Sequence, residues 1–139
     1  MAKHWEYYSD QNKQVDPDYG HDIISKERYV SEEFMDLEKE HIWKKIWLLG
    51  GPLLDLKEPG DYITTEIIDE SILIMKGEDN KIRAFYNVCQ HRGNQLVHSP
   101  TGNAKQHKCS FHAWTYNSAG TLINVPDEET FAQGAPCEK

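Results

Sequence analysis

The sequence has few cysteines, no long hydrophobic run and no excess of basic residues. Its three cysteines, at positions 89, 109 and 137, are too few and of the wrong parity for a secreted disulfide framework. The longest apolar stretch, residues 46–54, is interrupted by Gly50-Gly51-Pro52 and is too short for a transmembrane helix. A formal net charge of −8 argues against a nucleic acid or an anionic membrane as a partner. We therefore expect a cytoplasmic protein whose cysteines serve metal or thiol chemistry.

The 139 residues suit one globular domain with a short appended arm. The hydrophobic fraction of 38% and the charged fraction of 27% lie in the range of folded proteins. Residues 1 to 24 are polar and Tyr-rich and contain turn-forming Asp16-Pro17-Asp18, so we expect an extended arm there. We divide the chain into an N-terminal arm and helix, residues 1–48, and a second domain, residues 49–139.

A helix is predicted from residue 31 until Gly50-Gly51-Pro52 ends it. Ser31 is a suitable N-cap, the glutamates after it suit the positive helix N-terminus, and two lysines at 44 and 45 suit the negative end. Apolar residues recur at helical steps and form one face: Val30, Phe34, Leu37, Ile42 and Ile46. Trp43 and Trp47 widen this face, and we expect both to pack in the core.

The pattern changes to short strands after Pro59-Gly60, with β-branched and aromatic residues in alternation. Strands are predicted at residues 62–68, 71–76, 81–87, 105–108, 114–116 and 121–124, with turns at 77–80 and 117–120. The predicted fold class is therefore mainly β, a small antiparallel β-sandwich or barrel with an N-terminal helical arm.

Two short boxes in the second half of the chain combine a thiol with an imidazole. They are Cys89-Gln90-His91-Arg92-Gly93 and Cys109-Ser110-Phe111-His112. Such a set suits either a zinc ion or an iron–sulfur cluster. A zinc finger pairs Cys with Cys and His with His, whereas here each box mixes the two. The mixture favours a binuclear cluster, because two sulfurs can bind one iron and two imidazoles the other.

The residues around the boxes extend the pattern to Cys-x-His-Arg-Gly, then Cys-x-Phe-His-x-Trp-x-Tyr, then Gly-x-Leu at residues 120–122. This pattern resembles the Rieske [2Fe-2S] domain of aromatic-ring-hydroxylating oxygenase large (alpha) subunits, and the similarity covers roughly residues 25 to 126. The resemblance implies that Cys89 and Cys109 bind the inner iron, and that His91 and His112 bind the outer, more exposed one. The resemblance also implies a set of residues that surround the ligands and support the cluster without binding iron: Arg92, Gly93, Trp114 and Tyr116.

Two further histidines and the third cysteine are expected to lie outside the metal site. His98 and His107 are predicted to be surface residues on the excursion between the boxes, and Cys137 a free thiol or a packing residue. Gly93 and Gly120 are expected to supply a positive φ in their turns.

Departures from the Rieske proteins of respiratory complexes predict a low reduction potential. Those proteins resemble this chain but carry a disulfide bracing the cluster, where Asn94 and Phe111 stand here. They also place a hydrogen-bonding serine where this chain has Trp114. Fewer donors to the sulfurs stabilise the reduced cluster less, so we expect a potential near about −150 mV.

The resemblance also implies a larger protein. Its members hydroxylate at a mononuclear non-haem Fe(II) held by two histidines and a carboxylate in a C-terminal domain. We expect that domain to lie outside this sequence, since residues 127–139 contain no histidine. We expect an N-terminal part of a dioxygenase-type subunit, with a trimeric assembly, a possible small beta subunit, a ferredoxin or reductase donor, O2 and an aromatic substrate. The alternatives are a stand-alone Rieske ferredoxin and a structural zinc module.

Overall fold

A computed structural model describes residues 25–126, 128–134 and 136 of the chain. The chain divides into two compact units between Lys44 and Lys45. The expected extended arm, residues 1–24, and the expected free thiol Cys137 lie outside the described residues. The domain boundary expected between residues 48 and 49 stays a prediction.

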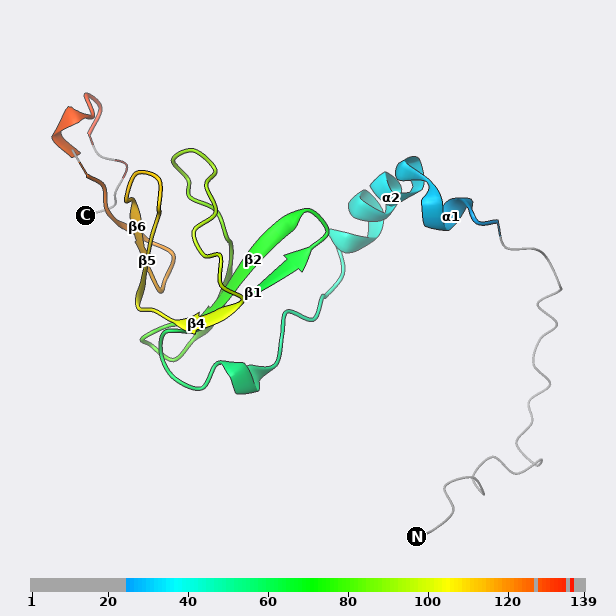
Figure 1. Ribbon diagram of the computed structural model, residues 1–139, viewed down its shortest axis with the longest axis horizontal. Helices are drawn as coiled ribbons and strands as arrows, with labels where there is room; N and C mark the ends of the chain where they lie inside the picture. Colours follow the sequence, from blue (N-terminus) through cyan, green and yellow to red (C-terminus); the bar gives the residue numbers. More distant parts are fainter. Residues whose placement is uncertain (1–24, 127, 135, 137–139) are drawn as a thin grey trace, which may run out of the picture. The chain divides into compact units, whose positions relative to one another are not determined.

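The described part of the first unit, residues 25–44, is mostly helical. Its elements are α1 (Glu27–Val30), α2 (Glu32–Glu38) and a π-helical turn, η3 (Lys39–Trp43) (Figure 1). The N-cap prediction is confirmed, because Ser31 Oγ accepts a hydrogen bond of 3.2 Å from the backbone N–H of Phe34. The regular helix is shorter than expected, since α-helical geometry ends at Glu38 and gives way to the wider π turn.

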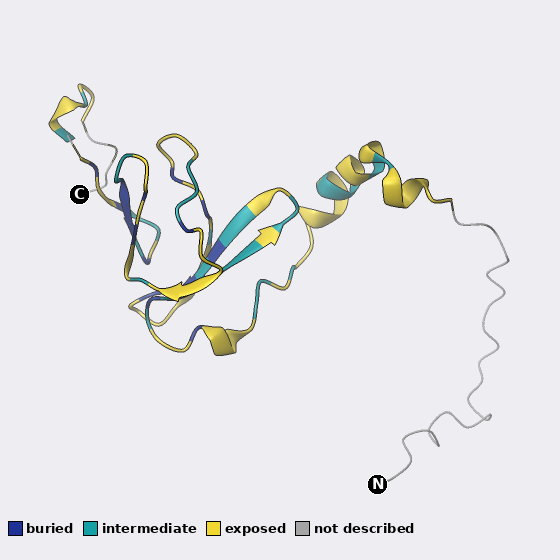
Figure 2. Ribbon diagram, viewed as in Figure 1, coloured by how far each residue is buried: buried dark blue, intermediate teal, exposed yellow. Residues whose placement is uncertain are grey.

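The apolar face predicted along this helix is largely exposed (Figure 2). Val30 is 70% exposed, Leu37 51% and Ile42 42%. The expectation that Trp43 and Trp47 pack in the core is wrong for the described chain, because Trp43 is 36% exposed and Trp47 is fully exposed. An apolar stripe becomes a core only where a second layer covers it, and the described residues of the first unit supply no such layer.

The second unit contains two antiparallel sheets. The first has the order β3-β2-β1-β4, built from β1 (Asp61–Ile67), β2 (Glu70–Lys76), β3 (Ile82–Tyr86) and β4 (Thr101–Asn103). The second has the order β5-β6-β7, built from β5 (Gln106–Lys108), β6 (Thr115–Asn117) and β7 (Leu122–Asn124). Short 3-10 helices, η4 (Leu53–Asp55) and η5 (Glu128–Thr130), precede and follow the sheets. The predicted mainly β, antiparallel fold class is confirmed.

One strand, β4, was not predicted from its sequence Thr-Gly-Asn. It pairs with the start of β1, where Gly102 lies opposite Tyr62. A Cβ atom on Gly102 would clash with the hydroxyl of Tyr62, so the glycine leaves room for that side chain. The strand is therefore specified by a cross-strand contact and not by a local pattern.

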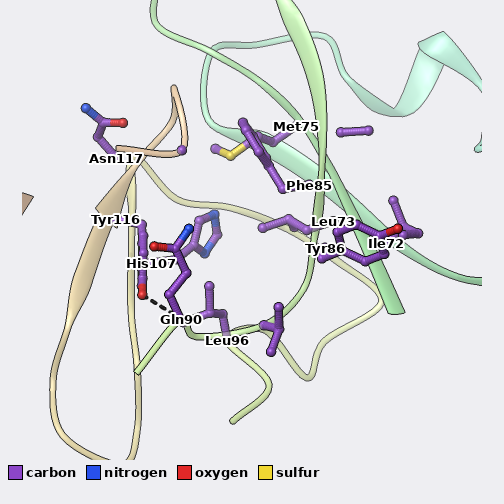
Figure 3. Close-up of a pocket in the computed structure, with 13 residues that line it drawn as sticks. Ile72, Leu73, Met75, Phe85, Tyr86, Gln90, Leu96, His107, Tyr116 and Asn117 are labelled. Carbon is purple, nitrogen blue, oxygen red and sulfur yellow. Dashed lines mark hydrogen bonds between the residues drawn. The ribbon is translucent and has the colours of Figure 1, made fainter. Parts of the chain in front are cut away.

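The buried core of the second unit falls into two clusters. One lies under the first sheet and contains Leu73, Met75 and Val97. The other lies under the two boxes and contains Cys89, Cys109, Trp114, Tyr116, Leu122 and Val125. A cavity of about 450 Å³ is lined by β2 and β3 on one side and by β5 and β6 on the other (Figure 3). Among the described residues, no helix has the length and apolar character needed to cross a bilayer.

Candidate metal centre

The two boxes fold into loops with the same backbone hydrogen bonds. In the first loop, residues 89–94, Cys89 N–H donates to Asn94 O at 2.8 Å and Gly93 N–H donates to Cys89 O at 3.0 Å. In the second loop, residues 109–114, Cys109 N–H donates to Trp114 O at 2.8 Å and Ala113 N–H donates to Cys109 O at 3.0 Å. A β-bridge closes the base of the first loop, and the β5–β6 pair closes the second.

This shared hydrogen-bond pattern requires a positive φ at the fifth position of each loop. Gly93 adopts φ 74° and Ala113 adopts φ 60°. The expectation for Gly93 is confirmed, as is that for Gly120, which has φ 85°. Ala113 was not predicted, because alanine gives no sequence signal for the left-handed conformation and adopts it against a steric penalty.

The loops bring the two predicted thiols together in the buried base and the two imidazoles together at the tip. Cys89 is 1% exposed and Cys109 3%, and both are free thiols. The ring centroids of His91 and His112 lie 4.7 Å apart in an edge-to-face arrangement. The structure therefore buries both thiols and sets the two imidazoles side by side, and the role of the four residues as ligands stays a prediction.

The electrostatics around Cys109 favour its thiolate form. Burial raises the pKa of Cys109. This effect is outweighed by hydrogen bonds from the backbone N–H groups of Phe111 and His112 and from the side chains of Cys89 and Asn94. The pKa of Cys109 therefore lies below its ordinary value. A thiolate is the form in which cysteine binds a metal, so the loop is built for a cationic ligand at this sulfur.

An orphaned atom in the same place fits a metal ligand. His112 Nδ1 is buried and has no hydrogen-bond partner among the described residues. A buried polar atom without a partner costs free energy unless a further group satisfies it, and iron would do so here. Two thiols and two imidazoles in separate pairs match a cluster with two irons better than one zinc ion.

Asn94 joins the two loops and was not predicted to do so. Its amide Nδ2 lies 3.2 Å from Ser110 Oγ and 3.6 Å from Cys109 Sγ, and it also donates to the carbonyl of Gln95 at 2.9 Å. The amide therefore fixes the separation of the loops and directs an N–H toward a sulfur. The only sequence signal was its position, the last of the first loop.

Tyr116 on β6 approaches the other sulfur. Its hydroxyl lies 3.5 Å from Cys89 Sγ and accepts a hydrogen bond of 3.0 Å from the backbone N–H of Gln90 (Figure 3). Burial, followed by the hydrogen bond with Cys89, raises the pKa of Tyr116 well above its ordinary value. The hydroxyl therefore keeps its proton and can donate it to a thiolate, in keeping with the supporting role predicted for Tyr116.

Aromatic rings flank both imidazoles. Trp114 stacks on His91 with ring centroids 4.6 Å apart and an interplanar angle of 14°. Phe111 lies against His112 with centroids 3.9 Å apart, and the Arg92 guanidinium lies 5.9 Å from the Phe111 ring centroid. Trp114 thus contacts a predicted ligand directly, whereas Arg92 approaches the centre through Phe111.

The surface prediction for His98 is confirmed, and that for His107 is wrong. His98 is exposed, whereas His107 is 7% exposed, faces the cavity beside Tyr116 and packs edge-to-face on Tyr62 at 5.3 Å (Figure 3). Burial lowers the pKa of His107, and its Nε2 has no partner among the described residues. The residue lies on β5, where strand alternation turns it inward and its exposed neighbours Gln106 and Lys108 outward.

Known proteins share this fold and these boxes. The family model of the Rieske [2Fe-2S] domain matches residues 46–135. The chain is 39% identical over 109 residues to the chlorobenzene dioxygenase subunit alpha of Cupriavidus sp. (strain PS12), covering 78% of this chain and 24% of that subunit. It is 44% identical over 95 residues to the carnitine monooxygenase oxygenase subunit of Acinetobacter baumannii, covering 68% of this chain and 25% of that subunit.

A solved structure of a dioxygenase is also similar to this chain. Naphthalene 1,2-dioxygenase with indole bound in the active site matches with a TM-score of 0.71 and 37% identity, covering 74% of this chain and 23% of that one. The chain spans about a quarter of the length of the curated relatives named above. The two loops and the similarity to these proteins point to the same family. The chain belongs to the Rieske [2Fe-2S] domain family.

Proposed function

We propose that this chain is the N-terminal part of an oxygenase alpha subunit and passes single electrons to a mononuclear non-haem iron elsewhere in that protein. The observation that carries the proposal is the pair of matching loops, which hold two buried thiols and two adjacent imidazoles. The relatives support an oxygenase, since those named above are alpha or oxygenase subunits of dioxygenases and a monooxygenase.

The residues divide the work of holding a [2Fe-2S] cluster, which supplies reversible one-electron chemistry when bound. Cys89 and Cys109 would hold one iron, and His91 and His112 the other. The hydroxyl of Tyr116 and the amide of Asn94 direct hydrogen bonds at the sulfurs. Burial keeps water from the thiols, while His91 remains exposed at the tip, where a redox partner can approach.

The wider assignment rests on the resemblance to ring-hydroxylating oxygenases and on the names of these relatives. We propose an aromatic substrate with O2 as co-substrate, a ferredoxin or reductase as electron donor, and a trimeric assembly with or without a small beta subunit. A cytoplasmic location fits the two free thiols and the sparse cysteines.

A single-turnover experiment on the product of the complete reading frame tests the proposal. The protein is reduced by one electron per cluster under argon, freed of excess reductant and mixed with O2 and an aromatic substrate such as chlorobenzene. We expect oxygenated product in proportion to the clusters oxidised, and none from the Cys109→Ser variant. Clusters that reoxidise without any product from aromatic or quaternary ammonium substrates would contradict an oxygenase role and favour a simple carrier.

A further inference from the structure

A buried imidazole lies on the wall of the cavity between the two sheets. His107 on β5 is 7% exposed and lines the cavity next to Tyr116, its cross-strand neighbour on β6 (Figure 3). Its Nε2 is buried and makes no hydrogen bond within the described part of the chain. An unsatisfied buried nitrogen costs free energy, so a ligand group that bonds to Nε2 would recover that cost.

The other polar side chains of the wall offer little to a ligand or to water. The Tyr116 hydroxyl accepts the backbone N–H of Gln90 and lies 3.5 Å from Cys89 Sγ. Asn117 Oδ1 accepts two backbone N–H groups from the turn that follows β6. The Gln90 residue is exposed to solvent. A buried water molecule needs about two to four polar partners, so the cavity suits an apolar molecule with one polar group better than it suits water.

The size and composition of the cavity favour a ring compound. Its volume of about 450 Å³ lies in the range of small-molecule sites, roughly 300 to 1,000 Å³. A cavity of about 150 Å³ holds benzene, so this one has room for two fused rings. Leu73, Met75 and Leu96 supply aliphatic and thioether surface, and Phe85 and Tyr86 add aromatic rings (Figure 3). Aromatic rings and thioethers both pack favourably against an aromatic ligand.

We propose that the cavity binds a small hydroxylated aromatic molecule of one or two rings, with its hydroxyl on His107 Nε2 and its rings against Phe85 and Met75. A hydroxyl both donates and accepts a hydrogen bond, so it satisfies Nε2 in either tautomer of the imidazole. A carboxylate or an ammonium group would bring a charge into apolar surroundings, which disfavours charged ligands. This binding site goes beyond the proposed electron-transfer function and does not depend on it.

Equilibrium dialysis of the cluster-loaded chain tests the proposal with two probes. The probes are 2-naphthol and naphthalene, which share the same rings and differ by the hydroxyl that is assigned to His107. The parent chain is compared with His107→Leu, which removes the nitrogen and keeps an apolar side chain, and with Leu96→Trp, which fills the cavity. The control is His98→Leu, which makes the same substitution at an exposed position outside the cavity wall.

We expect the parent chain to bind 2-naphthol about tenfold more tightly than naphthalene, because only the naphthol bonds to Nε2. His107→Leu should remove this preference by weakening 2-naphthol binding about tenfold, while naphthalene binding stays within about twofold. Leu96→Trp should weaken the binding of both probes at least about tenfold, because the larger side chain occupies their space. His98→Leu should change neither affinity by more than about twofold.

The folded state of each variant is first checked by circular dichroism, and His107→Leu carries the test if Leu96→Trp fails to fold. A parent chain that does not retain 2-naphthol would overturn the proposal. Equal affinities for 2-naphthol in the parent chain and in folded His107→Leu, or equal weakening by His98→Leu, would also overturn it. In the product of the complete reading frame, the share of 2-naphthol binding that depends on His107 must persist. Its loss there would show that another part of that protein fills the cavity, and would overturn the proposal as well.

Discussion

Hydrogen bonds to the sulfurs are the residue-scale feature with the clearest functional consequence. The Tyr116 hydroxyl reaches Cys89 at 3.5 Å, and the Asn94 amide reaches Cys109 at 3.6 Å. Each donor stabilises the more negative, reduced state of a cluster more than the oxidised state. The motif around Tyr116 predicts its supporting role, whereas no local pattern predicts that of Asn94, because its amide acts between two loops that are separate in the sequence.

Tyr116→Phe should lower the reduction potential by about 40 mV, because one hydrogen bond of about 1 kcal/mol is lost in a one-electron couple. The midpoint is measured by redox titration followed by EPR. Tyr86→Phe is the matched control, since Tyr86 is 63% exposed on the edge strand β3. An unchanged potential in Tyr116→Phe would show that the hydroxyl does not donate to the cluster.

His107→Leu should raise the free energy of unfolding by about 1 kcal/mol. The change removes the cost of a buried nitrogen without a partner and keeps an apolar group in the cavity. Urea unfolding of the cluster-loaded chain measures the effect. His98→Leu, at an exposed position, should leave stability nearly unchanged. A strongly destabilised His107→Leu would mean that His107 makes a necessary polar contact.

At the scale of elements, the two loops are near copies of each other in backbone structure. Their cysteines occupy the same position, whereas the histidines stand third in one loop and fourth in the other. The sequence predicted the strands that support the loops, because alternation and turn residues mark them. It did not predict β4, whose three residues are defined by pairing with β1. It also overextended the helix, since helical periodicity continues into the π turn.

Substitutions at the fifth position of each loop should have opposite effects on stability. Gly93→Ala should cost about 1 kcal/mol, because φ is 74° and the strain is conformational, with no atom within 4 Å of the added Cβ. Ala113→Gly should gain up to about 1 kcal/mol by relieving the same strain at φ 60°. Urea midpoints of the cluster-loaded chains measure both, and a change of the same sign in the two variants would contradict the equivalence of the loops.

The β2–β3 turn carries a pH-dependent contribution to stability. Hydrogen bonds from Arg83, and from the backbone N–H of Lys81, hold the pKa of Asp79 well below its ordinary value. The carboxylate therefore stabilises the fold above the unfolded pKa of about 4, and this contribution is lost as the pH falls through the lower folded value. Asp79→Asn should lower the melting temperature at neutral pH, with a difference that shrinks toward about pH 2. A pH-independent difference, or an equal one in Glu66→Gln, would contradict the ion pair as its source.

At the scale of the whole molecule, the sequence predicted the class of fold and the residues that gather at the tip. Ligand spacing is a local property, so it could be read directly from the two boxes. Burial is a property of the assembled layers, which explains the wrong predictions for Trp43, Trp47 and His107. The sequence pattern around each residue indicates which face of its helix or strand the residue occupies. It does not indicate whether another layer covers that face.

The reduction potential is a property of this whole environment. The chain lacks a bracing disulfide, since Asn94 and Phe111 stand at the positions concerned, and Trp114 offers a stacked ring where a hydroxyl would donate. We expect a midpoint of about −150 mV, a potential that suits the proposed delivery of electrons to an oxygen-activating iron. Protein-film voltammetry measures it, and a midpoint well above zero would contradict the proposed direction of electron flow.

A binuclear iron–sulfur cluster is expected at Cys89, His91, Cys109 and His112. Its most direct test is EPR of the anaerobically reduced protein, together with iron and inorganic sulfide analysis. We expect two irons and two sulfides per chain, with hyperfine coupling from two imidazole nitrogens in the EPR signal. A colourless, EPR-silent protein that holds one zinc ion would contradict it.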